Sequence, residues 1–200
     1  MKTLYESILN KSGVGKMHQI QSWLDQYGIK NYTINNKGEI DVDGNVFLGD
    51  RNLTEFPPFI QFGTVNGFFN CSLCGLTSLR GCPQIVKKSF YCEYNKLTSL
   101  EGAPKKVSGN FYCGTNKLES LEGAPEEVNG SFYCQNNKLT SLEGVPREVE
   151  GSFNCTYNKL RSLKGSPSVV GGDFNCKDNA TNFTKDDVKK VCKISGEITV

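Results

Sequence analysis

Residues 111–125 are FYCGTNKLESLEGAP, and residues 132–146 are FYCQNNKLTSLEGVP, which keeps the same frame of letters 21 positions later. The frame recurs in six consecutive copies. One of its columns is cysteine, at Cys71, Cys92, Cys113, Cys134, Cys155 and Cys176. A second column is phenylalanine, two residues earlier, at Phe69, Phe90, Phe111, Phe132, Phe153 and Phe174. Columns that keep one register define an internal repeat, and a period of this length is typical of a solenoid.

The full repeat follows the pattern V-x-G-x-F-x-C-x-x-N-x-L-x-S-L-x-G-x-P. Alternation along the F-x-C segment places Phe and Cys on one side of a short strand, which we expect to face the core. One repeat is too small to bury these side chains alone, so stacking must complete the core and pair the strands into a parallel sheet. The returning segments, such as LEGAPKKVSG at residues 100–109, contain Gly and Pro, which argues against a helix on the outer side.

The chain has nine cysteines, and the regular spacing of six of them has a structural explanation. Cysteine behaves as a small buried hydrophobe. Neighbouring strands lie about 4.8 Å apart, whereas a disulfide needs Cβ atoms about 3.8 Å apart, so we expect stacked, reduced thiols. Only Cys71 and Cys74 have C-x-x-C spacing, and zinc sites need two such pairs. We predict no metal site.

Both ends depart from the repeat. Apolar residues at helical spacing in residues 15–29 predict an amphipathic helix, and residues 31–48 alternate like a hairpin. A degenerate repeat begins at Val46, with a two-residue insertion near Pro57. Thr184 opens a capping-box pattern for a short helix, followed by a possible strand in residues 194–200. We therefore divide the chain into a helix and hairpin cap (1–45), repeats of about 21 residues (46–183) and a second cap (184–200).

The repeat resembles the leucine-rich repeat, whose pattern L-x-x-L-x-L-x-x-N/C-x-L it matches with Phe and Cys at the two strand leucines. The Asn position holds Asn95, Asn116, Asn137, Asn158 and Asn179, with Cys74 in the first full copy. The segments ESIL, WLDQYGIKNYTIN and IDVDGNV, together with the repeats, are similar to small leucine-rich-repeat proteins of tailed bacteriophages over nearly the whole chain. The resemblance implies a mostly β leucine-rich-repeat solenoid with a parallel sheet, a helix and hairpin cap at the N-terminus and a short-helix cap at the C-terminus, acting inside an infected bacterium.

Composition narrows the function. There are 23 Lys and Arg against 21 Asp and Glu, so strong nucleic-acid or anionic-membrane binding is not indicated. We find no apolar run long enough for a membrane span and no export signal, and we expect a soluble cytoplasmic protein, in the host cytoplasm if phage-encoded. The single histidine, His18, and the lack of paired acids or an activated nucleophile predict a protein without catalytic residues, cofactor or metal.

In a leucine-rich repeat the outward strand residues form the concave face, and here they are Tyr and Asn. Tyrosine is enriched at protein interfaces, although cross-strand stacking alone would also explain a tyrosine column. We predict a protein partner bound by Asn70, Tyr91, Glu93, Tyr94, Tyr112, Tyr133, Gln135, Asn154, Tyr157 and Asn175. The partner would be a host or phage protein, and antagonism of a bacterial defence factor fits the resemblance.

Two alternatives remain open. The array could be a structural or assembly component of a virion. It could also bind nucleic acid through a lysine column formed by Lys96, Lys117, Lys138 and Lys159. That column runs beside Glu101, Glu122 and Glu143, so a solvated surface that compensates its own charge is the favoured interpretation.

Overall fold

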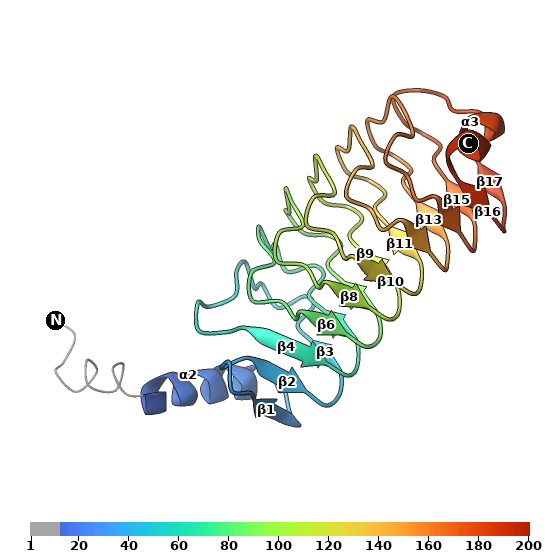
Figure 1. Cartoon of the computed structure of the whole chain (residues 1–200). Helices are drawn as coiled ribbons and strands as arrows, with labels where there is room; N and C mark the ends of the chain where they lie inside the picture. Colours follow the sequence, from blue (N-terminus) through green and yellow to red (C-terminus); the bar gives the residue numbers. More distant parts are fainter. Residues whose placement is uncertain (1–12) are drawn as a thin grey trace.

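The computed structural model describes residues 13–200, which form a mostly β parallel solenoid with two short helices, one before and one after the stacked turns (Figure 1). Residues 1–12, part of the predicted first cap, lie outside the described residues. The helices are α2 (Gly13–Gln26) and α3 (Lys185–Val191). The strands are short and belong to two sheets that run the length of the solenoid.

The eight-stranded sheet contains the predicted Phe and Cys columns. Its strands are β3 (Val46–Phe47), β5 (Phe69–Asn70), β7 (Phe90–Tyr91), β9 (Phe111–Tyr112), β11 (Phe132–Tyr133), β13 (Phe153–Asn154), β15 (Phe174–Asn175) and β17 (Ile198–Thr199). Pairing is parallel throughout, with each Phe opposite the Phe of the next turn. The phenylalanines are fully buried, and the rings of Phe69, Phe90 and Phe111 stack with centroids 5.6 Å apart.

A second parallel sheet lies where the sequence predicts only extended or turn-like segments. The nine-stranded sheet consists of β1 (Tyr32–Ile34), β2 (Ile40–Val42), β4 (Phe62–Val65), β6 (Ile85–Val86), β8 (Lys106–Val107), β10 (Glu127–Val128), β12 (Glu148–Val149), β14 (Val169–Val170) and β16 (Lys193–Ile194). The parallel sheet predicted for the F-x-C strands is present, and this second sheet was not predicted. The valine column buries its side chains while the residue before each valine stays outside, and this alternation is that of a half-buried strand.

All nine cysteines are buried free thiols, as predicted for the six of the repeat column; Cys74, Cys82 and Cys192 are buried as well. The Sγ atoms of Cys92 and Cys113 lie 3.3 and 3.4 Å from the carbonyl oxygens of Tyr112 and Tyr133 on the following turn. Burial raises the pKa of Cys92, Cys134 and Cys155 well above the usual value of a thiol. These groups are core packing residues without thiolate reactivity.

The asparagine column fastens each turn to the one before it. Asn137 accepts a hydrogen bond from the Leu118 N–H (3.0 Å) and donates to the carbonyls of Cys113 (3.1 Å) and Cys134 (3.2 Å). Equivalent bonds are made by Asn95, Asn116, Asn158 and Asn179. The side chain therefore satisfies buried backbone groups at the bend where the chain leaves the sheet.

That bend requires left-handed backbone in every turn. The residue two positions after each column cysteine has φ between 52° and 57°, and the column comprises Leu73, Tyr94, Thr115, Asn136, Tyr157 and Asp178. Asn and Asp tolerate this region, but Leu, Tyr and Thr rarely occupy it.

At the N-terminal end, α2 buries Ile20, Trp23 and Leu24, and the Trp23 ring lies 6.3 Å from that of Phe62. The predicted hairpin is present as antiparallel β1 and β2, but β2 also pairs in parallel with β4 and so belongs to the first turn. The predicted two-residue insertion is confirmed, because Val46 aligns with Phe69, 23 residues on.

At the C-terminal end, Thr184 and Asp187 form the predicted capping box of α3, and Val188 is buried. The predicted final strand is two strands, β16 and β17, one at the end of each sheet.

Candidate binding surface

The outward residues of the eight-stranded sheet include a tyrosine row, which we define as Tyr91, Tyr112 and Tyr133. Strands β7, β9 and β11 place these residues in one register. The rings are nearly parallel, at 6° and 7°, with centroids 4.7 and 4.8 Å apart. Because each ring covers the face of its neighbour, the side chains are only half-exposed and present ring edges and hydroxyls. The stacking that would stabilise the sheet is therefore present, and the same contacts hold the row rigid.

The structure extends this column at both ends. The register aligns Phe47 with Asn70 and Tyr91, and Phe47 is 54% exposed. Sequence analysis missed Phe47, although its position between Val46 and Leu48 in the degenerate repeat could have indicated it. Phe68 packs edge-on against Tyr91, with centroids 6.2 Å apart. The other end continues through Asn154 and Asn175.

The predicted asparagines are less available than the tyrosines. The Asn70 side-chain oxygen accepts hydrogen bonds from the hydroxyl (2.6 Å) and N–H (2.9 Å) of Ser72. Asn154 makes the same pair of bonds with Thr156, at 2.9 and 3.0 Å. Since these bonds occupy the acceptor oxygens, Asn70 and Asn154 can offer a partner mainly their amide donors.

Glu93 and Gln135 lie in the adjacent outward column, on either side of Gly114. Burial raises the pKa of the half-buried Glu93 carboxyl. Gln135 lies over Gly114, where an added Cβ would stand 2.7 Å from its Nε2 atom. Its Oε1 atom is buried and has no hydrogen-bond partner among the described residues. This unpaired acceptor is therefore enclosed beneath the outward surface, beside the tyrosine row.

The hydroxyl of Tyr112, the central ring of the row, shows no sign of chemical activation. Burial is the main cause that raises the pKa of Tyr112, although Asn110 donates a hydrogen bond to its hydroxyl at 2.9 Å. A phenol with a raised pKa is a poor base and a poor nucleophile. The arrangement suits contact and hydrogen bonding.

Tyr94 and Tyr157, predicted in the same set, lie outside the tyrosine row. They occupy the left-handed positions after β7 and β13 and are 55% and 53% exposed. The predicted residues therefore divide into the tyrosine row with its neighbours and a second group beside the lysine column.

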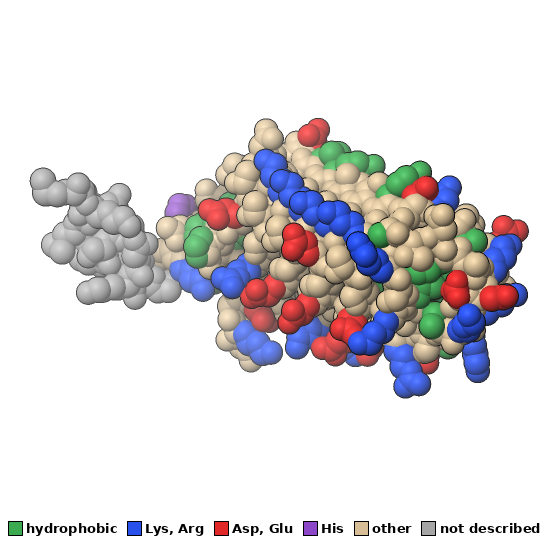
Figure 2. Space-filling model, turned by 90° about the horizontal axis from the view of Figure 1, so that it is seen from above, with side chains coloured by type: hydrophobic (Ala, Val, Ile, Leu, Met, Phe, Trp, Pro, Cys, Tyr) green, Lys and Arg blue, Asp and Glu red, His purple; other side chains and the backbone are tan. Residues whose placement is uncertain are grey.

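The lysine column, which we call the lysine ladder, comprises Lys96, Lys117, Lys138 and Lys159, all exposed. Figure 2 shows a continuous band of basic side chains crossing successive turns, with hydrophobic side chains to one side. Two of the acids that were expected to balance the positive charge of the lysine ladder form ion pairs with other residues. Glu101 pairs with Arg80 at 3.1 Å, and Glu143 pairs with Lys164 at 2.9 Å.

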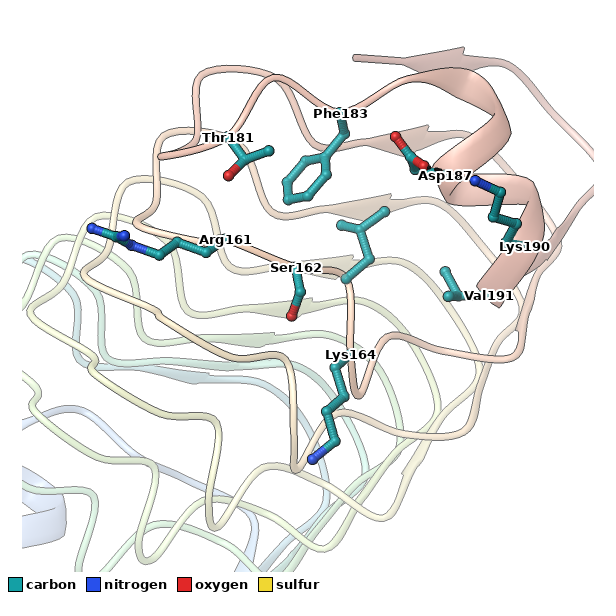
Figure 3. Close-up of a pocket in the computed structure, with 9 residues that line it drawn as sticks. Arg161, Ser162, Lys164, Thr181, Phe183, Asp187, Lys190 and Val191 are labelled. Carbon is teal, nitrogen blue, oxygen red and sulfur yellow. Dashed lines mark hydrogen bonds and ion pairs between the residues drawn. The ribbon is translucent and has the colours of Figure 1, made fainter.

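A pocket of about 530 Å³ lies between the last turns and α3. Figure 3 shows Phe183 and Val191 beside it, with Arg161, Lys164 and Lys190 around them. Lys190 pairs with Asp187 at 3.1 Å, which leaves the wall near α3 close to neutral. The pocket combines an apolar wall with a polar rim and contains no pair of groups arranged for acid–base chemistry.

Within residues 13–200 there is no group of three His, Cys, Asp or Glu side chains placed to hold a metal ion. Neither helix of this part of the chain is long and apolar enough to cross a membrane. Comparisons with protein-family models, curated proteins and solved structures find no match to the chain. The strand pairing and the repeat length identify the fold as a parallel β-solenoid of 21-residue repeats.

Proposed function

We propose that the chain is a non-enzymatic protein-binding module that uses the outward face of the eight-stranded sheet, predicted from sequence as the concave Tyr/Asn face. The observation that carries the proposal is the tyrosine row, with the exposed ring of Phe47 two turns away in the same column. Aromatic side chains are enriched in the well-packed centres of protein interfaces, where they dominate the binding energy.

Rigidity supports the proposal. Stacking at 4.7 and 4.8 Å holds each Tyr side chain in one conformation before any partner arrives. A partner would therefore lose little of its binding energy to ordering these side chains.

The resemblance to bacteriophage repeat proteins guides the choice of partner. We propose a host or phage protein, with antagonism of a bacterial defence factor as the biological role.

The test is affinity purification of the tagged protein from bacterial lysate, followed by mass spectrometry. One variant combines Tyr91→Ala, Tyr112→Ala and Tyr133→Ala. A matched control combines Lys106→Ala, Glu127→Ala and Glu148→Ala in an outward column of the nine-stranded sheet. Circular dichroism would verify that both variants fold.

A partner retained by the wild type and the control but lost by the tyrosine variant supports the proposal. Retention of the same partner by all three would move recognition off the tyrosine row. If the wild type retains no partner above background, the protein-binding assignment itself fails.

A further inference from the structure

The lysine ladder carries like charges on four consecutive turns, which is unfavourable for folding. Adjacent turns of a parallel sheet are about 4.8 Å apart, and like charges opposite one another destabilise a sheet. At three other places this solenoid pairs opposite charges on successive turns, namely Arg80 with Glu101, Lys106 with Glu127, and Glu143 with Lys164. The described residues offer the ladder no such ion pair.

Large aromatic side chains stand at both ends of the ladder. Tyr94 precedes Lys96 by two residues, and Tyr157 precedes Lys159 by two. Both tyrosines are more than half exposed and both have φ near 55°. Left-handed backbone strains a Tyr, and the same column tolerates Asn136 and Asp178. Leu73 in the same column is equally exposed, and what distinguishes Tyr94 and Tyr157 is that they are flat aromatic rings on the first and last turns of the ladder.

We propose that the lysine ladder, with Tyr94 and Tyr157, binds single-stranded nucleic acid. Surfaces that bind single strands combine a track of positive charge for the phosphates with aromatic rings on which bases stack. Four lysines on adjacent turns span about 14 Å, from three intervals of about 4.8 Å. A nucleic-acid strand places a phosphate about every 3.4 Å when stacked, so the ladder matches about four nucleotides with a ring at each end.

The exposed rings favour a single strand over the alternatives. A duplex keeps its base faces paired and stacked, so it could use the lysines but not the tyrosines. An acidic polypeptide would likewise use the charges without any need for two flat rings at the ends. The surface is separate from the tyrosine row, and this inference stands whether or not the protein-binding proposal holds.

The test measures fluorescence anisotropy of a fluorescein-labelled oligo(dT) 12-mer over a range of salt concentrations. Neutralising four phosphates predicts a slope of about −2.8 in log K against log salt. Affinity should thus fall about 50-fold between 50 and 200 mM salt. Absence of binding at 50 mM salt would overturn the proposal.

Two variants compare the loss of the four ladder lysines with the loss of four lysines elsewhere on the surface. Changing Lys96, Lys117, Lys138 and Lys159 to Gln should abolish most binding and flatten the salt dependence. The control changes four exposed lysines away from the ladder to Gln, namely Lys30, Lys37, Lys87 and Lys105. If both variants lose affinity equally, the binding reflects net charge and the ladder has no special role.

The rings have their own test. Combining Tyr94→Ala with Tyr157→Ala should weaken binding at least about 5-fold per ring, because each base stacked on an aromatic ring contributes about 1 kcal/mol or more. The salt slope should stay unchanged, since no charge is removed. Poly-glutamate of matched charge should bind more weakly than oligo(dT). Equal or tighter binding of poly-glutamate, or duplex binding that equals that of the single strand, would exclude the assignment.

Discussion

The asparagine column should hold the turns together, and Asn137→Ala should therefore destabilise the fold. Asn137 is buried, accepts one hydrogen bond from the Leu118 N–H and donates to the carbonyls of Cys113 and Cys134. Alanine removes all of these bonds, and their backbone partners belong to buried residues.

Asn137 also donates to the Gln135 carbonyl (3.3 Å), and the loss is unequal among these four backbone groups. The Gln135 carbonyl keeps a bond from the Thr115 N–H (2.9 Å). The Cys113 carbonyl keeps a bond from Asn116 (3.1 Å), and the Cys134 carbonyl keeps one from Asn158 (3.0 Å). The Leu118 N–H has no second acceptor among the described residues. One buried group left without a partner costs about 1–3 kcal/mol, and each lost bond whose acceptor keeps another partner costs about 0.5 kcal/mol. With three such lost bonds, the expected loss in unfolding free energy is about 2.5–4.5 kcal/mol.

Urea unfolding followed by circular dichroism measures this loss, and Asn129→Ala is the control. Asn129 is exposed, and its backbone N–H bonds to the Val107 carbonyl whatever its side chain, so the change should stay within about 0.5 kcal/mol. Hydrogen exchange gives a local measurement, because the Leu118 amide should lose protection in Asn137→Ala. If Asn137→Ala were as stable as the control and the Leu118 amide stayed protected, the asparagine column would not be what holds the turns together.

Three further outcomes are expected. Tyr112→Ala should lower the unfolding free energy by about 1–3 kcal/mol, since it ends ring stacking on both sides; Tyr112→Phe, which keeps the ring, should cost less than half as much in the same urea titration. Gly102→Ala should destabilise the fold far more than Gly28→Ala. Both glycines have positive φ, but only at Gly102 would an added Cβ meet a backbone atom, 2.7 Å away. Comparable melting temperatures of the two variants would contradict this reasoning. The unfolding free energy should fall as pH rises from about 9 towards 11. Burial raises the pKa of two thiols to about 11, so the unfolded chain loses these protons at a lower pH than the folded chain. Unfolding free energies measured from pH 7 to 11 would test this expectation, and a flat profile would count against it. The two thiols are those of Cys176 and Cys192.

The repeat made most of the core predictable. Inward columns at Phe, Cys and Leu positions follow from local alternation, and translation by 21 residues brings like residues into contact in every turn. The capping box at Thr184 and the helix around Trp23 follow from equally local patterns. The stacking of Tyr91, Tyr112 and Tyr133 also follows, because residues in one column must be neighbours once the strands pair in parallel.

The sequence by itself thus determined the solenoid, its period, its buried columns and the tyrosine row, because each depends on a repeat that every turn satisfies in the same way. The tertiary structure alone decided that the valine segments pair into a second sheet. It also decided that Phe47 lies in the same column as the tyrosine row. It also decided which acids pair with Arg80 and Lys164, leaving the lysine ladder without them. These features depend on backbone direction at each bend and on contacts between columns, which a pattern within one column does not specify.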